Sequence, residues 1–353
     1  MTAAPAEAAE AVAARRTGWF RRRLGAAVAR LARLMLHVFF REILVSGLDH
    51  IPAGVPLVFV ANHNNSVVDA LLLLALPGAR PRMLAKSTLF AHPVMGPLLA
   101  LADALPVYRR QDPGADVALN LETFARCREA LAAGGQIALF PEGTSHNQER
   151  RLPIKSGAAR IVLETEALHG PLGLRIIPVG LNYEAKERFR SRVWVRVGQA
   201  VDPGAELAGY RHEPKAAVRA LTARIAAVLE NATRGPERQG RGLEASPTAL
   251  SRSWPLAQRI VTLPVFLVGC VLNWIPYRIP GWLSDVLSTT PDEPATYKLL
   301  AGLVAFPLFW AGEVILVAKW AGPAWGLAVA LLAPATGYAA LRLYEEGRPE
   351  ARL

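Results

Sequence analysis

The sequence predicts an α/β protein with a central mixed sheet flanked by helices, an amphipathic helix before the sheet and a transmembrane helical hairpin after it. Three observations support this prediction. Short apolar runs rich in β-branched residues alternate with helical runs between about residues 43 and 230, which is typical of an α/β domain. Arginines are interleaved with apolar residues just before that region, and long apolar runs follow it.

The N-terminal part divides into two segments. Residues 1–18 are rich in alanine and have no apolar block long enough for a signal peptide, so we expect a disordered tail. Residues 19–44 have apolar positions at helical spacing with arginines between them. A basic helix with an apolar face suits the surface of an anionic bilayer. The alternative is an amphipathic helix packed on the domain, and the two roles are compatible.

Residues 45–230 are assigned to the α/β domain, and residues 231–253, which are polar and rich in Gly, Pro and Arg, to a linker. The strands and helices of the domain are expected from runs of β-branched residues and from helical periodicity, respectively. The expected strands are 55–61, 136–140, 174–182 and 193–199, and the expected helices are 66–76, 94–102, 116–132, 156–168 and 214–230.

The hydrophobic region, residues 254–345, contains two apolar runs, 299–318 and 320–341, each about the 20 residues that cross a hydrocarbon core. They predict a helical hairpin over about 299–341, with a buried helical pair as the alternative. Cationic residues flank this hairpin, which favours cytoplasmic ends for it. Residues 260–276 are shorter and contain two prolines, so a re-entrant segment, an interfacial segment and a third span all stay open.

Composition restricts the class of protein. The chain has a formal net charge of +11, 52% hydrophobic residues and a mean hydropathy of +0.22, which excludes a disordered protein. The arginine surplus suits phosphates and anionic lipid head groups. A nucleic-acid partner is not expected, because the C-terminus is hydrophobic and no aromatic-basic recognition module is present. Two cysteines provide no disulfide framework, which is typical of a reducing compartment.

The first candidate for chemistry is His63, which follows an expected strand, together with Asp69 in the next expected helix. Residues six apart on one helix do not face each other, so His63 must lie in the loop if it is to meet Asp69. A carboxylate on one ring nitrogen fixes the tautomer and leaves the other nitrogen as a base. The alternative is a structural, hydrogen-bonded histidine.

The second candidate is the segment FPEGTSH, in which a buried strand runs into Pro141, Glu142 and Gly143. Ligands of open α/β sheets gather at the carboxyl ends of the strands. Arg150, Arg151 and Lys155 follow, just before a possible helix start that would suit a phosphate. The alternative is a turn with solvated charges. Two further segments, LPVYRRQD with Arg109 and Arg110 and the strand IIPVGLNY, are uninformative alone.

In this order, NH followed by an aspartate, an arginine block, FPEG and a later IPV strand resemble the glycerolipid acyltransferase superfamily over about residues 45–230. The resemblance implies an acyltransferase-like fold, with His63 as the general base and Asp69 as its partner. It also implies an acyl-CoA or acyl carrier protein thioester as the donor and a glycerophosphate as the acceptor. The implied substrate-binding residues are Arg109, Arg110, Glu142, Gly143, Thr144, Ser145 and Lys155.

Two features depart from the usual family pattern. Five residues separate His63 from Asp69, one more than usual, and Thr144-Ser145-His146 stands where Thr-Arg-Ser is usual. Both features resemble the branch of fungal glycerol-3-phosphate/dihydroxyacetone-phosphate acyltransferases, which also has a hydrophobic C-terminal part. The missing arginine leaves open which basic residue would hold the acceptor phosphate.

The expected activity is transfer of an acyl group to glycerol-3-phosphate in phospholipid biosynthesis, at the cytoplasmic membrane with the catalytic domain facing the cytoplasm. The alternatives are 1-acylglycerol-3-phosphate or another lysophospholipid as acceptor, and a non-catalytic membrane adaptor. No acyl-enzyme is expected, because neither cysteine lies in a motif and no serine stands in a nucleophile elbow. Neither a metal nor another cofactor is expected, because the seven histidines show no zinc-type pairing.

Overall fold

The computed structural model describes residues 25–93, 95–112, 114–146, 152–234 and 256–346. It separates into two compact units, residues 1–235 and 236–353, which we call the α/β unit and the C-terminal helical unit. The expected tail and most of the expected linker lie outside the described residues. Residues 231–233, expected in the linker, instead end the helix α7 (Pro214–Thr233), whose buried positions continue to Ala232.

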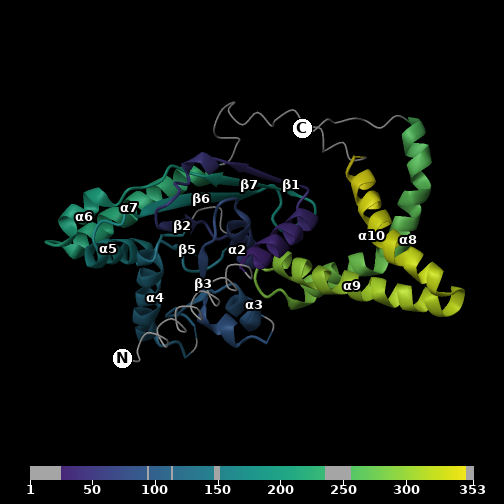
Figure 1. Ribbon diagram of the computed structural model, residues 1–353, viewed down its shortest axis with the longest axis horizontal. Coiled ribbons are helices and arrows are strands. Elements are labelled where there is room, and N and C mark those ends of the chain that lie inside the picture. The colour runs from purple at the N-terminus through teal and green to yellow at the C-terminus, as the bar shows by residue number, and fades with distance from the viewer. Residues whose placement is uncertain (1–24, 94, 113, 147–151, 235–255, 347–353) are drawn as a thin grey trace, which may run out of the picture. The chain divides into compact units, whose positions relative to one another are not determined.

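The α/β unit is built on one seven-stranded mixed sheet with the order β1-β7-β6-β2-β5-β3-β4 (Figure 1). All neighbouring strands are parallel except β6 and β7, which are antiparallel. The predicted fold class is therefore confirmed. The strands are β1 (Glu42–Ser46), β2 (Leu57–Ala61), β3 (Arg82–Lys86), β4 (Leu105–Val107), β5 (Gln136–Leu139), β6 (Arg175–Tyr183) and β7 (Arg192–Val197).

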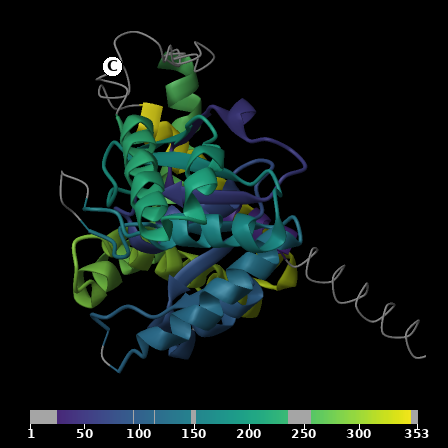
Figure 2. The ribbon, with the colours of Figure 1, turned by 90° about the vertical axis from the view of Figure 1, so that its left-hand side faces the viewer.

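The central strand β2 is buried along its whole length, as expected for a strand whose two faces are both covered. Helices α4 (Asn120–Ala132), α5 (Gly157–His169) and α7 pack on one face of the sheet, and their apolar stripes form the main core with Val58 and Val60. Figure 2 shows these helices in front of the sheet. Besides the N-terminal helix described next, the other helices described in this unit are α2 (Ser66–Ala75), α3 (Met95–Leu101), α6 (Gly204–Tyr210) and the short 3-10 helices η1 (Leu48–His50), η2 (Ser87–Ala91) and η3 (Val117–Leu119).

The N-terminal helix occupies residues 25–39 of the described chain and ends before β1. The prediction of a helix through residue 44 is wrong at its end, because residues 42–44 pair with β7. The helix buries one face down to Phe39 and Phe40, and Leu34 on the opposite face is 62% exposed. The ring of Phe40 lies 5.9 Å from that of Tyr183.

The end of this helix is fixed by Arg190, which has a left-handed backbone conformation with φ 63°. Its guanidinium donates hydrogen bonds to the carbonyls of His37, Val38 and Phe40, at 2.8, 3.2 and 3.0 Å. The last carbonyls of a helix have no partner within the helix, so one planar cation satisfies several of them here. The helix is therefore attached firmly to the α/β unit.

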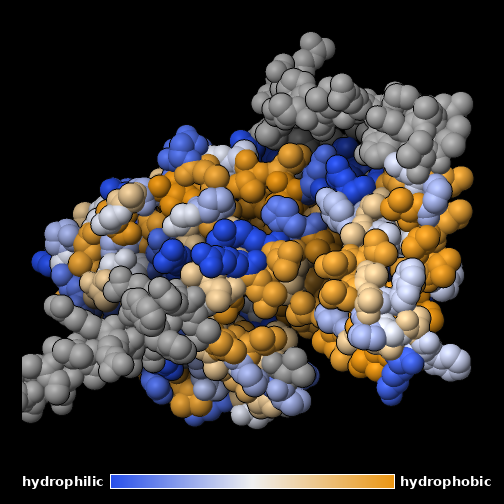
Figure 3. Space-filling model, turned by 45° about the vertical axis from the view of Figure 1, so that its right-hand side comes forward, coloured by the Kyte–Doolittle hydropathy of each residue, from blue (hydrophilic) through white to orange (hydrophobic). Residues whose placement is uncertain are grey.

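The C-terminal helical unit contains α8 (Leu256–Leu287), α9 (Pro294–Ala321) and α10 (Pro323–Glu346). All three are long and apolar enough to cross a membrane, with candidate spans over Thr262–Leu287, Pro294–Ala321 and Pro323–Tyr344. The expected hairpin corresponds to α9 and α10, and the undecided segment 260–276 is part of α8. Many large hydrophobic side chains are exposed on these helices, and Figure 3 shows extensive hydrophobic areas interrupted by polar ones, as expected of helices that could cross a membrane.

These three helices are joined by a buried asparagine. The Asn273 amide in α8 donates to the carbonyls of Gly269 and Ala333 at 3.0 and 3.1 Å, and its oxygen accepts from the Trp310 indole at 2.9 Å. A Cβ atom on Gly337 would lie only 2.7 Å from Asn273. Small residues permit this close approach of helices, and a polar side chain then bonds across it.

Candidate active site

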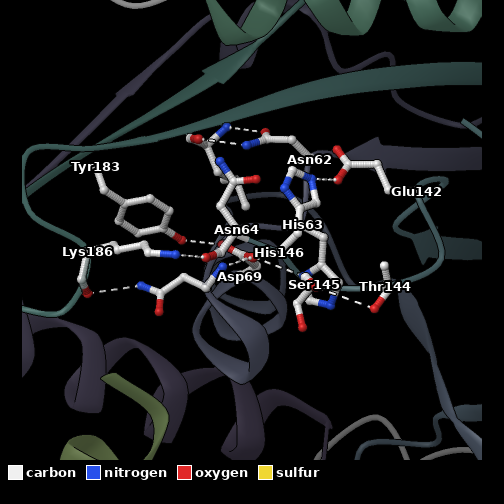
Figure 4. A network of polar contacts seen from close by, with 12 residues as sticks. Asn62, His63, Asn64, Asp69, Glu142, Thr144, Ser145, His146, Tyr183 and Lys186 are labelled. Atoms are coloured by element: carbon white, nitrogen blue, oxygen red, sulfur yellow. Dashed lines mark hydrogen bonds and ion pairs between the residues drawn. The ribbon is translucent and has the colours of Figure 1, made fainter. Parts of the chain in front are cut away.

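The residues of the candidate site lie at one edge of the sheet, at or just after the ends of three neighbouring parallel strands. His63 follows β2 by two residues, Pro141 follows β5, and Tyr183 ends β6. Because β2 pairs in parallel with both β5 and β6, their carboxyl ends meet at the same edge. Figure 4 shows the polar network that these segments form.

His63 lies in the loop between β2 and α2, as the spacing of the pair requires. Its Nδ1 is 2.9 Å from Oδ2 of Asp69, which lies in the first turn of α2. The side chain of Asp69 is completely buried, whereas that of His63 is 19% exposed. The Nε2 atom of His63 makes no hydrogen bond to any described residue. The arrangement therefore presents one imidazole nitrogen as a base, with a buried carboxylate behind the ring.

Asp69 is held by two donors besides His63. The backbone N–H of Asn65 donates to the same Oδ2 atom at 2.7 Å, and the Tyr183 hydroxyl donates to Oδ1. Burial, and next the charge of Asp69, raises the pKa of Tyr183 well above its usual value, so the hydroxyl keeps its proton at neutral pH. Tyr183 was not assigned a role from the sequence, because nothing in the sequence shows that the end of β6 lies beside α2.

The segment Phe140–His146 supports His63 from the other side. The ring of Phe140 stacks on the His63 imidazole with the centroids 3.9 Å apart and the planes at 7°. The backbone N–H of His146 donates to the carbonyl oxygen of His63 at 3.1 Å. These two contacts join the FPEG turn directly to the loop that carries the candidate base.

The turn itself contains a second carboxylate–imidazole pair. The side chain of Glu142 is completely buried, and its Oε2 is hydrogen-bonded with Nε2 of His146, which is 7% exposed. Gly143 has a φ of 74°, a left-handed conformation that glycine adopts without strain. Thr144 and Ser145 are half-buried, and the Thr144 hydroxyl donates to the Ser145 carbonyl at 3.3 Å.

Basic side chains converge on Gly143. The Arg109 guanidinium donates to the Gly143 carbonyl at 3.2 Å and forms two bonds, of 3.0 and 2.9 Å, with the Asp112 carboxylate. The ammonium of Lys155 lies so close that a Cβ atom on Gly143 would be 2.5 Å from its Nζ. Arg110 is exposed. Of the expected basic candidates, Arg109 and Lys155 thus contact the turn, whereas Arg150 and Arg151 lie outside the described residues.

Asp112 organises these cations, and the sequence did not single it out. The hydrogen bonds from Arg109, outweighing burial, hold the pKa of Asp112 below its usual value. The Lys86 ammonium, at the end of β3, lies 3.4 Å from the same carboxylate. The buried acid therefore stays ionised and fixes Arg109 in place.

Cys127 does not have the environment of a nucleophile. Cys127 is buried in α4, and burial raises its pKa to about 12, so the thiolate is scarce at neutral pH. Cys270 lies in α8 of the helical unit.

Fold and site together define an α/β domain with a histidine–aspartate pair at the carboxyl ends of parallel strands. Residues 42–182 match the family model described as Acyltransferase, and they form a domain of the acyltransferase family. The chain's relatives are glycerolipid acyltransferases, so the resemblance seen in the sequence is confirmed.

Two relatives and one solved structure indicate the range of the similarity. The chain is 30% identical to the chloroplastic 1-acyl-sn-glycerol-3-phosphate acyltransferase BAT2 of Brassica napus, over 46% of this chain and 43% of that protein. It is 34% identical to Glycerol-3-phosphate O-acyltransferase 1 of Saccharomyces cerevisiae, over 31% of this chain and 15% of that protein. The crystal structure of the 1-acyl-sn-glycerophosphate acyltransferase PlsC from Thermotoga maritima is similar with a TM-score of 0.45 and 19% identity, over 63% of this chain and 82% of that one. The chain thus spans less than half the length of the curated relatives it matches.

Proposed function

We propose that the protein is a membrane-associated O-acyltransferase that moves a fatty acyl group from acyl-CoA or acyl carrier protein to a hydroxyl of glycerol-3-phosphate. One observation carries the proposal. His63 has Asp69 on one ring nitrogen and none of the described residues on the other, and it is joined through His146 to a turn on which Arg109 and Lys155 converge. A base beside a phosphate-binding cluster is what acylation of a glycerophosphate needs.

The reaction proceeds by direct transfer. Nε2 of His63 takes the proton of the acceptor hydroxyl as its oxygen attacks the thioester carbonyl carbon. Asp69 stabilises the resulting imidazolium, and the tetrahedral intermediate collapses with cleavage of the carbon–sulfur bond. The imidazolium then returns the proton to the departing thiolate, which leaves an ester and a free thiol. No acyl-enzyme, metal or other cofactor takes part in this scheme.

The acceptor phosphate sits against Arg109 and Lys155 at Gly143. Arginine forks and lysine ammonium groups are the usual partners of phosphate oxygens, and anchoring the phosphate fixes the hydroxyl near the base. Asp112 neutralises part of the Arg109 charge, so Lys155 is the stronger electrostatic contributor of the two. Arg110 is exposed and has a secondary role in this proposal.

A second acceptor follows from the names of the relatives. The Brassica napus protein is named for 1-acyl-sn-glycerol-3-phosphate, and the yeast protein for glycerol-3-phosphate. Both acceptors carry the same phosphate and a free hydroxyl, so this site suits either. A non-catalytic membrane adaptor is disfavoured, because an adaptor needs no hydrogen-bonded His63–Asp69 pair with an open nitrogen.

The experiment is acyl transfer by the purified full chain in nanodiscs, with labelled acyl-CoA or acyl carrier protein and a panel of acceptors. The panel holds glycerol-3-phosphate, dihydroxyacetone phosphate, 1-acylglycerol-3-phosphate and lysophosphatidylcholine, and mass spectrometry identifies the product. We expect acylated glycerol-3-phosphate from the wild type and almost none from His63→Ala. Acylation of lysophosphatidylcholine alone, or full activity of His63→Ala, would refute the proposal.

We also propose that the α/β unit faces the cytoplasm at the cytoplasmic membrane, because the basic N-terminal helix suits an anionic leaflet. If α8, α9 and α10 all cross, the chain after α10 lies on the opposite side, which reverses the cytoplasmic hairpin ends that the flanking cations favour. Reporters fused to the two ends measure this topology. Opposite sides are the expected result, and two cytoplasmic ends would show that one of the three helices does not cross.

A further inference from the structure

The departure of this chain from the usual family pattern after FPEG has a structural counterpart in His146. Its imidazole is buried in the turn and bonds the completely buried carboxylate of Glu142. Its backbone N–H bonds the carbonyl oxygen of His63. One residue therefore touches both halves of the candidate site, the loop with the base and the turn on which the cations converge.

We propose that His146 is a positioning residue, which holds the FPEG turn in register with His63 by binding the Glu142 carboxylate. The inference rests on the proposed acyl transfer and deepens it by assigning a role to a residue outside the resemblance. A carboxylate removed from water requires a hydrogen-bond donor, and the ring Nε2–H supplies one within the same turn. The turn so held carries Phe140 onto the His63 ring and Gly143 against Arg109 and Lys155.

Loss of the His146 ring donor should impair the reaction of the glycerol-3-phosphate acceptor rather than the binding of the acyl donor. Without this donor, the FPEG turn can move relative to His63. The distance between the phosphate site and the base is then no longer fixed. A misplacement of this kind lowers the rate of a positioned reaction strongly even when both groups remain present. The kinetic loss should therefore appear in kcat/KM for glycerol-3-phosphate, while the KM for the acyl donor stays nearly unchanged.

Two substitutions that introduce the same amide group on side chains of different length test whether the residue at position 146 must reach Glu142. In His146→Gln the amide nitrogen stands as many bonds from Cα as Nε2 does, so it can still reach Glu142. In His146→Asn the amide is one bond shorter and cannot. Both keep the backbone N–H that binds His63. His146→Asn should lower kcat/KM for glycerol-3-phosphate by about ten- to a hundredfold, the loss expected for a hydrogen bond to a charged group, and His146→Gln should restore most of it.

A double-mutant cycle tests whether His146 acts through Glu142. Glu142→Gln should lower kcat/KM on its own, and the pair Glu142→Gln with His146→Asn should lose little more than either single variant. Additive losses would overturn the proposal. So would an Asn variant equal to wild type, a Gln variant as impaired as Asn, or a parallel rise in the donor KM. Thermal unfolding of each variant in nanodiscs identifies misfolded protein, and if Glu142→Gln does not fold, the comparison of His146→Asn with His146→Gln still decides.

The same assay distinguishes failure of this role from failure of the proposed function. A wild type that acylates glycerol-3-phosphate together with an unaffected His146→Asn variant overturns the role of His146 alone. A wild type that acylates no acceptor in the panel overturns the proposed function and this role with it.

Discussion

Replacing Asp69 by asparagine tests the catalytic proposal at its centre. The backbone N–H of Asn65 is a fixed donor to Oδ2, so the new amide oxygen must take that position and also accept from His63 Nδ1. The amide nitrogen then faces the Tyr183 hydroxyl, which can turn to accept. Asp69→Asn thus keeps the geometry of the pair and removes only its negative charge.

The magnitude follows from that lost charge. Replacing a charge-assisted hydrogen bond by a neutral one weakens it by about 1.4 kcal/mol, or tenfold in rate. The imidazolium formed in the transition state also loses a counter-charge, whose attraction at about 4 Å is about 4 kcal/mol with an effective dielectric constant near 20. That energy is an upper bound and corresponds to about a thousandfold lower rate. We expect kcat to fall by a factor between these limits, and by about 10²–10⁴ in His63→Ala.

The assay is steady-state acyl transfer to glycerol-3-phosphate, with thermal unfolding to show that each variant is folded. Tyr183→Phe is the matched control, because it removes one hydrogen bond to Asp69 and leaves the charge. It should cost less in kcat than Asp69→Asn does, because the imidazolium keeps its charged partner although one hydrogen bond to that carboxylate is lost. A folded Asp69→Asn variant within twofold of wild type, or a Tyr183→Phe variant more impaired than Asp69→Asn, would refute the reasoning.

Three further predictions concern the turn, the cation cluster and the helical unit. Gly143→Ala should raise the KM for glycerol-3-phosphate, because a Cβ atom would displace the lysine ammonium and the left-handed backbone would be strained; an unchanged KM would contradict the phosphate site. Asp112→Asn should destabilise the protein at neutral pH because it breaks the Arg109 pair. The lowered pKa of Asp112 means that this difference in unfolding temperature is full above about pH 4 and vanishes as the pH falls through that lowered pKa; a difference independent of pH would contradict it. Asn273→Leu should lower the free energy of unfolding in nanodiscs by about 1–2 kcal/mol, the range for hydrogen bonds between membrane helices. This decrease should be smaller in a Trp310→Phe background, and equal decreases in both backgrounds would show that the indole hydrogen bond contributes nothing.

Local patterns in the sequence predicted the elements that depend on local chemistry. The strand before His63 and the helix that carries Asp69 have strong patterns, so their junction could be assigned. Strand β1 could not, because its partner β7 lies about 150 residues further along the chain and pairing leaves no mark in the run EILVS. Strand β3 was missed because RMLAK is short and has a charge at each end.

The candidate site, like the fold, was predictable from the sequence only where its residues lie close together in the chain. The His63–Asp69 pair is local, so spacing alone restricted how the two residues could meet. The roles of Tyr183 and Asp112 depend on which strands are neighbours and on which loop meets which turn, and one sequence contains neither fact. Prolines left the assignment of residues 260–276 open, but the structure shows one helix, α8, that continues to Leu287. Membrane helices tolerate proline when neighbouring groups satisfy the freed carbonyls.

The contact between Phe40 and Tyr183 has a consequence for the proposed acyl transfer, whose product would belong in a bilayer. Tyr183 touches the acid behind the imidazole, and Phe40 follows directly on the helix whose end Arg190 fixes. If that helix rests on lipid, only a phenyl ring, a phenol and a carboxylate separate it from the reacting nitrogen. In the proposed reaction, these packed side chains then set the depth of acyl transfer, and a fatty chain meets the base at one depth in the bilayer.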